Sequence, residues 1–210
     1  MKTVGMRSLL VVAAACAALA GFWLARQLDR ETPTLASGTW LPTPKHIDDF
    51  ALADAAGHPY TRADLLRAPT LVYFGFTRCP DVCPTTLVKL AQIVKQAAVP
   101  NLRVLFVSID PQRDTPQVLG LYVHAFDPAF QGVTGAPAEI LRVAKNFAVA
   151  VNRVELPGGD YTMDHSAVVF LVGAGGIAAI FTPPFDAAAF ASDLRRAAPL
   201  LGARPARNPA

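Results

Sequence analysis

Two short runs of apolar, β-branched and aromatic residues constrain the fold of this chain more than any other feature. Residues 70–76 read TLVYFGF and residues 103–109 read RVLFVSI. Neither run shows a regular alternation of apolar and polar side chains, which is typical of strands buried on both faces of a sheet. Such a sheet needs a cover of helices on each face. The two runs therefore predict an α/β fold with these strands at its centre.

Helical and turn signals around these runs predict the other elements. The predicted strands are 70–76, 103–109, 149–154, 166–172 and 177–181, and the predicted helices are 61–67, 85–98, 115–126, 137–147 and 186–200. A further hairpin or turn is expected at 57–59, and the GAGG sequence at 173–176 predicts a second hairpin. Hairpins are antiparallel and strand–helix–strand units are parallel, so we expect a central mixed sheet flanked by helices.

The N-terminus predicts a membrane anchor. Lys2 and Arg7 precede an apolar stretch of 18 residues, 8–25, which Arg26 closes. A bilayer-spanning helix needs about 17–25 residues, whereas the apolar region of a cleaved signal peptide usually has about 7–15. We expect an uncleaved, single-pass anchor at residues 1–26, with a cleaved signal peptide as the alternative. The following domain is then expected on the periplasmic side of a bacterial inner membrane.

The composition of the rest of the chain predicts a linker, one globular domain and a C-terminal tail. Residues 27–44 are rich in Pro, Thr and charge, and we interpret them as a linker. Residues 45–201 are expected to form one globular domain, and residues 202–210 a disordered tail. The formal net charge is +3, without a dense basic stripe of interleaved aromatic residues, so no nucleic-acid partner is expected.

Cys79 and Cys83 are the only cysteines outside the predicted anchor, which contains Cys16. They lie directly after the first buried run, where open α/β sheets place their sites. In helical geometry a separation of four residues puts two Cα atoms about 6 Å apart, which allows a disulfide and also lets both sulfurs reach one ion. Pro84 fits the first position of a helix, so the helix dipole is expected to favour the thiolate form of Cys83. The pair is a candidate disulfide, redox pair or metal site.

His165 is the histidine that we expect to complete a metal site. It lies just before the predicted strand 166–172, in a loop expected to face the cysteines. The other histidines are expected on the surface (His46 and His58) or at a helix end (His124). Structural zinc takes four protein ligands, and iron–sulfur clusters usually need four cysteines. Two thiolates and one imidazole suit copper best.

Four neighbouring residues receive lesser expectations. Asp164 is expected to orient His165 or to adjust the charge at the metal, as carboxylates beside metal ligands do, or to serve in a turn or cap. Asp114 or Thr115 is expected to cap the next helix. Met163 is expected to pack rather than to bind metal.

Three sequence blocks resemble the signatures of the SCO/SenC family of copper chaperones. They are FGFTRCPDVCPTT at 74–86, SIDPQRDTP at 108–116 and YTMDHSAVVFLV at 161–172. The similarity extends over about residues 50–200, and the blocks have the order and separations of the family. The three blocks together are far more specific than any one of them.

The resemblance implies a thioredoxin-like fold with one copper ion, Cu(I) or Cu(II), bound by Cys79, Cys83 and His165. It also implies delivery of copper to the binuclear CuA centre of cytochrome c oxidase subunit II, with a periplasmic thiol reductant and copper donor proteins as further partners. Delivery needs no turnover, so no enzyme activity is expected. The alternative is a thiol–disulfide oxidoreductase that reduces the cysteines of the oxidase subunit, in which Cys79 attacks and His165 is dispensable.

Overall fold

The computed structural model describes residues 3–28 and 33–202, which fall into two compact units divided between Thr32 and Pro33. The first unit contains helix α1 (Thr3–Leu28). In the part of the chain that the structure describes, no helix is long and apolar enough to cross a membrane. The structure therefore does not support the predicted transmembrane anchor.

The second unit contains every strand and helix that the sequence predicts, together with the additional strands β1, β6 and β8. Its strands are β1 (Gly38–Lys45), β2 (Ala51–Asp54), β3 (Pro59–Thr61), β4 (Thr70–Gly75), β5 (Arg103–Ser108), β6 (Gln131–Thr134), β7 (Val151–Glu155), β8 (Tyr161–His165), β9 (Val169–Gly173) and β10 (Gly176–Phe181). Its helices are α2 (Arg62–Leu65), α3 (Val82–Ala97), α4 (Pro116–His124), α5 (Pro137–Asn146) and α6 (Ala187–Leu201).

Eight of these strands form one mixed sheet in the order β1-β10-β9-β4-β5-β6-β2-β3. Strands β4, β5 and β6 are parallel to one another, and all other neighbours in the sheet are antiparallel. Every residue of β4 is buried. The apolar runs at 70–76 and 103–109 thus form adjacent strands in the middle of the sheet, as predicted.

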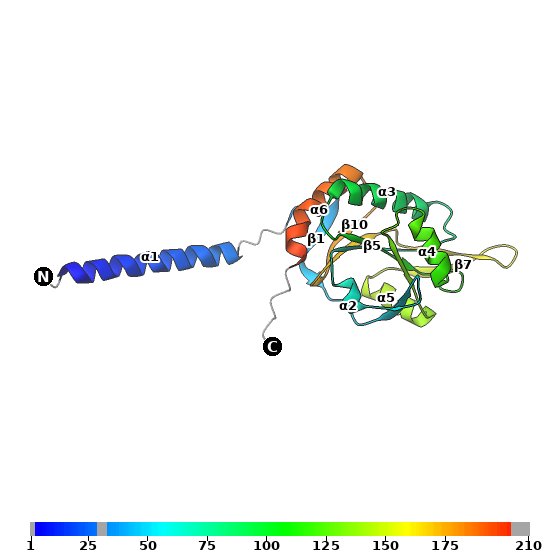
Figure 1. Cartoon of the computed structure of the whole chain (residues 1–210), viewed down its shortest axis with the longest axis horizontal. Helices are drawn as coiled ribbons and strands as arrows, with labels where there is room; N and C mark the ends of the chain where they lie inside the picture. The colour runs from blue at the N-terminus through cyan, green and yellow to red at the C-terminus, as the bar shows by residue number, and fades with distance from the viewer. Residues whose placement is uncertain (1–2, 29–32, 203–210) are drawn as a thin grey trace. The chain divides into compact units, whose positions relative to one another are not determined.

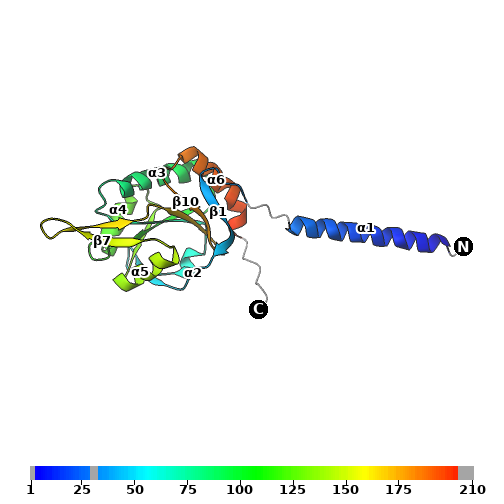
Figure 2. The ribbon, with the colours of Figure 1, turned by 180° about the vertical axis from the view of Figure 1, so that it is seen from behind.

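Helices cover both faces of the sheet. Helices α3 and α6 pack against each other along one side, and α2 and α5 lie along the other side in both views (Figures 1 and 2). Pro116 is the first residue of α4, and the Thr115 side chain accepts a hydrogen bond from the Val118 N–H, which is a helix cap. The predicted central mixed sheet flanked by helices is confirmed.

Strand β1 overlaps the predicted linker, so this part of the prediction is wrong. Residues of β1 pair antiparallel with β10 at the edge of the sheet. Pro42 and Pro44 favoured a linker interpretation because proline cannot donate a hydrogen bond to a sheet. They are tolerated here because β1 is an edge strand whose register shifts between Trp40 and Lys45. Of the predicted tail, residues 203–210 lie outside the described residues.

Asp193 on α6 ties the segment before β1 to the domain. Its carboxylate is fully buried and accepts hydrogen bonds from the N–H groups of Ala36 (2.9 Å) and Ser37 (2.7 Å) and from the Ser37 hydroxyl (2.8 Å). The Arg196 Nη1 atom lies 3.6 Å from it. A buried carboxylate needs such partners, because burying an unpaired charge costs several kcal/mol. The stable domain therefore begins before Gly38.

Strands β7 and β8 form a separate antiparallel hairpin, which extends beyond the neighbouring helices in Figures 1 and 2. Side chains alternate between the two faces of a strand, so Tyr161, Met163 and His165 share one face of β8. The hairpin therefore places the predicted histidine ligand and the tyrosine at the start of its strand on the same side.

Candidate metal centre

The cysteines lie in the connection between β4 and α3. Cys79 is half-buried in the turn before the helix, and its N–H donates to the Phe76 carbonyl oxygen at 3.2 Å. Cys83 is the second residue of α3, and its side chain is fully buried. The Cys83 N–H lies 3.4 Å from the Cys79 Sγ atom, with the sulfur as acceptor. Both are free thiols.

The structure brings His165 to Cys83. The His165 Nε2 atom lies 3.6 Å from the Cys83 Sγ atom, although 82 residues separate them in the sequence. The Nδ1 atom lies 3.1 Å from the carbonyl oxygen of Ser166. A carbonyl oxygen only accepts, so this contact places the ring proton on Nδ1 and leaves the lone pair of Nε2 facing the thiol.

The three predicted ligands do not form a ready-made metal cage. Among the described residues, no three side chains of His, Cys, Asp or Glu are close enough together to hold an ion. Cys83 and His165 are in contact, whereas the Cys79 sulfur points to the first turn of α3. Two sulfurs and an imidazole nitrogen are nevertheless a donor set that fits copper.

Burial dominates the electrostatics of the site. It raises the pKa of the Cys83 thiol from 9.0 to about 12, while a hydrogen bond from the Phe76 backbone acts in the opposite direction. Burial therefore opposes the thiolate form that was expected for Cys83, because loss of water disfavours the charged sulfur. Burial also lowers the pKa of His165, which favours the neutral imidazole that a metal requires.

We expect the metal-free, reduced protein to lose stability as the pH rises above about 9. Because the native Cys83 thiol keeps a proton that the unfolded chain releases, the free energy of unfolding falls by up to about 1.4 kcal/mol per pH unit from 9 towards 12. Urea unfolding at about pH 8.0, 8.5 and 9.0 measures the onset of this slope, because tyrosines of the unfolded chain, with a pKa of about 10, still keep most of their protons there. The Cys83→Ser variant is expected to lack this slope, and an unchanged slope would contradict the assignment.

Strand β4 approaches Cys83 so closely that no side chain fits at residue 75. A Cβ atom on Gly75 would lie 2.8 Å from the Cys83 Sγ atom and 2.8 Å from the ring of Phe106. Both distances are well inside van der Waals contact, and neither neighbour is a flexible chain end. Glycine at the end of β4 therefore lets the buried thiol rest against the strand.

Aromatic residues that the sequence analysis did not single out surround the contact between Cys83 and His165. The Tyr73 hydroxyl lies 3.7 Å from the Cys83 Sγ atom and donates to it. The rings of Tyr73 and Phe76 lie edge-on to the His165 ring, with centroids 6.1 and 6.2 Å away. In the sequence, Tyr73 and Phe76 were marked only by their positions in β4 and directly after it. Ordinary core residues occupy such positions as well, so the sequence did not distinguish the two as parts of the site.

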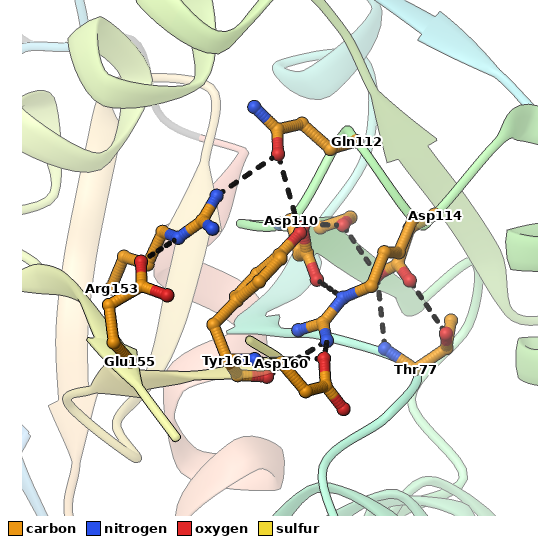
Figure 3. Close-up of polar contacts among 10 residues, drawn as sticks. Thr77, Asp110, Gln112, Asp114, Arg153, Glu155, Asp160 and Tyr161 are labelled. Carbon is orange, nitrogen blue, oxygen red and sulfur yellow. Dashed lines mark hydrogen bonds and ion pairs between the residues drawn. The ribbon is translucent and has the colours of Figure 1, made fainter. Parts of the chain in front are cut away.

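Asp114 has a different role from the predicted helix cap, which Thr115 provides. Its buried carboxylate accepts hydrogen bonds from the Thr77 N–H (3.0 Å), the Thr77 hydroxyl (2.6 Å) and the Ser108 hydroxyl (2.7 Å). Figure 3 shows Asp114 directed at Thr77. Thr77 lies two residues before Cys79, so this carboxylate fixes the start of the cysteine loop.

The remaining candidates lie apart from the contact between Cys83 and His165. His46 and His58 are exposed beside aspartates, and His124 ends α4, as predicted. Asp164 is exposed, and the contact that orients His165 is the one with the Ser166 carbonyl, so the structure does not support an orienting role for Asp164. Met163 packs against the core, as expected.

Comparison with known proteins gives a consistent result. Residues 41–199 match the family model described as SCO1/SenC. The chain is 35% identical to the protein SCO2 homolog, mitochondrial, of Bos taurus over 181 residues, which are 82% of this chain and 68% of the relative. It is 39% identical to the protein SCO1 homolog, mitochondrial, of Homo sapiens over 136 residues, 60% of this chain and 44% of the relative. The chain thus spans less than half the length of some curated relatives that it matches.

Solved structures agree with these sequence matches. Bradyrhizobium japonicum ScoI with copper bound matches with a TM-score of 0.66 and 37% identity, over 72% of this chain and 99% of that one. Arabidopsis thaliana ScoI with copper bound matches with a TM-score of 0.67 and 32% identity, over 71% of this chain and 98% of that one.

Proposed function

Because the chain belongs to the SCO1/SenC family, we propose that it is a copper chaperone that holds one copper ion with Cys79, Cys83 and His165. The observation that carries this proposal is the 3.6 Å approach of the His165 Nε2 atom to the buried Cys83 sulfur. Copper-bound structures of relatives at 37% and 32% identity support the choice of metal. Thiolates and imidazole are ligands that suit copper.

Loading requires the thiols to release their protons. The raised pKa of Cys83 keeps it protonated in the metal-free protein, so copper competes with a proton for this sulfur. Neutral His165 offers its Nε2 lone pair without such competition. The half-exposed Cys79 is the ligand that solvent and a partner protein reach first, because Cys83 is fully buried.

The recipient and the location are proposed from the family resemblance. We place delivery at the CuA centre of cytochrome c oxidase subunit II, on the periplasmic side of the membrane, with a thiol reductant that keeps the cysteines reduced. The apolar stretch at 8–25, preceded by Lys2 and Arg7, supports export of the second unit. Cell fractionation and transfer of copper to the purified subunit domain test these two statements separately.

Copper titration of the reduced full-length chain tests the proposed function. We expect one tightly bound ion per chain, with a thiolate-to-Cu(II) absorption band when Cu(II) is used. The His165→Ala variant is expected to bind more weakly and to shift that band. The His58→Ala variant is the matched control, because His58 is exposed and lies apart from the cysteines. Weak binding that does not depend on His165 would refute the three-ligand site.

The two free thiols also support a second candidate function, thiol–disulfide exchange. The Cys79 thiolate would attack a partner disulfide and form a mixed disulfide, and Cys83 would then displace the partner. The partner leaves as a dithiol, and the cysteine pair is oxidised to a disulfide. In this case His165→Ala leaves the exchange rate with an oxidised peptide unchanged, whereas a copper chaperone loses metal affinity in the same variant.

A further inference from the structure

The loop after β5 connects the two segments that carry the proposed copper ligands. Asp114 holds Thr77, in the cysteine loop, by two hydrogen bonds. The preceding residue, Arg113, contacts Tyr161, the first residue of β8. His165 is the last residue of that strand. Neighbouring residues of one loop therefore hold the cysteine segment and the histidine segment.

Tyr161 is held at its ring, its hydroxyl and its backbone. The guanidinium carbons of Arg113 and Arg153 each lie 3.6 Å from the ring centroid. The hydroxyl donates to the Asp110 carboxylate at 2.8 Å, and Arg113 Nη1 donates to the Tyr161 carbonyl oxygen at 2.9 Å. Figure 3 shows the Tyr161 side chain between Arg153 and Asp110. Contacts of an arginine with a ring face and with hydrogen-bond acceptors are strong for non-covalent interactions.

The supports of Tyr161 are themselves fixed. Arg113 and Asp110 form an ion pair, and their side chains are only 12% and 3% exposed. Gln112 accepts a hydrogen bond from Arg153 at 3.3 Å, which connects the hairpin to the same loop. We call Asp110, Arg113, Arg153 and Tyr161 the tyrosine clamp.

The position of His165 depends on the strand that carries it. Its Nδ1 contact is to Ser166, the next residue along the chain, so that contact moves with the strand. Among the described residues strand β8 pairs only with β7, outside the main sheet, with Tyr161 opposite Glu155 and His165 opposite Val151. A two-stranded hairpin is marginally stable by itself. Met163 and Val151 pack against the core near the His165 end, and the contacts of Tyr161 fix the other end of β8.

We propose that the tyrosine clamp is a set of positioning residues that sets the distance between His165 Nε2 and Cys83 Sγ and so the geometry of the copper site. The predicted effect on copper binding rests on the proposed copper function. The predicted effect on the position of His165 does not, and it can be tested without metal. None of these contacts of the clamp residues involves the side chain of Cys79, Cys83 or His165. The clamp therefore acts on the copper site through strand β8.

Two measurements on the full-length, reduced chain test the clamp. In the metal-free protein, nuclear Overhauser contacts of the His165 ring with the Tyr73 and Phe76 rings are expected in wild type and in Tyr161→Phe, and are expected to vanish in Tyr161→Ala. In copper titrations, Tyr161→Ala is expected to bind about 10- to 100-fold more weakly. Its Cu(II) spectrum should resemble that of His165→Ala. Tyr161→Phe keeps the ring and the backbone contacts, so we expect it to rescue both readouts.

A matched control separates positioning from general stability. Asp186→Ala removes the cap of α6, where the Asp186 side chain accepts from the Ala189 N–H, and should lower stability without changing either readout. Tyr161→Leu fills more of the space and serves if Tyr161→Ala does not fold. Retained ring contacts in the Ala or Leu variant would overturn the clamp, whatever the copper affinity. A wild-type chain that binds no copper would refute the proposed function, and the ring contacts would still decide the clamp.

Discussion

Changing Cys83 to serine is expected to abolish tight copper binding by the reduced chain. The affinity should fall well beyond the roughly 10- to 100-fold that loss of an outer-shell partner costs, because the hydroxyl is a hard, neutral donor at the centre of a soft site. Serine occupies nearly the same buried space, and the Tyr73 hydroxyl can donate to it as it does to the sulfur. The fold should therefore survive. Competition with a Cu(I) chelator of known affinity measures the effect.

The third cysteine supplies the control for this experiment. Cys16 lies in α1, in the first unit of the chain, so Cys16→Ser makes the same chemical change in a unit that contains none of the proposed ligands. We expect it to bind copper as the wild type does. Equal affinities of wild type and Cys83→Ser would show that the ion is held elsewhere.

A chain that begins at Gly38 is expected to be about 1–3 kcal/mol less stable than one that begins at Pro33, which is the cost of leaving a buried acceptor without its donors. The shorter chain lacks Ala36 and Ser37, so the buried Asp193 carboxylate loses three hydrogen-bond donors. Since a domain of this kind is stable by only about 5–15 kcal/mol, the loss is a large share of the total. Urea unfolding of the two truncated chains measures the difference.

The Asp193→Ala substitution shows whether the carboxylate is the cause. In the chain that begins at Pro33 it should be strongly destabilising, because Ala36 and Ser37 lose their acceptor. In the chain that begins at Gly38 it should cost much less, because the Asp193 carboxylate has already lost its three hydrogen-bond donors and keeps only its contact with Arg196. Equal costs in both chains would mean that the lost stability comes from other contacts of the segment, such as those of Leu35 with the core.

Local sequence patterns were sufficient to predict the buried strands and the long helices. An apolar run such as 70–76 has few alternatives, and Pro116 at a first helical position marks the start of α4. Strand β1 was missed because its prolines and exposed side chains resemble a linker, and only the pairing with β10 makes it a strand. Pairing with a distant partner leaves little trace in local sequence.

The sequence led to the contact between Cys83 and His165, which the structure shows, and less directly to its chemistry. The cysteine loop and His165 could be proposed from spacing and resemblance. The protonation of Cys83 could not, because it depends on the depth at which the first turn of α3 is buried. The clamp around Tyr161 was also out of reach, since it joins residues about 50 positions apart through side-chain geometry.

The long separation between Cys83 and His165 sets an order of events in the making of this protein. The cysteines leave the ribosome 82 residues before the histidine, which at about 5–20 residues per second is a delay of about 4–16 seconds. During that interval β9 and β10 are also missing, so the sheet is incomplete on the side of β4 that they occupy. The nascent chain thus presents two thiols without their third partner. If the proposed copper site is correct, selective metal loading is a property of the finished protein, and the thiols need protection from oxidation while the chain is still growing.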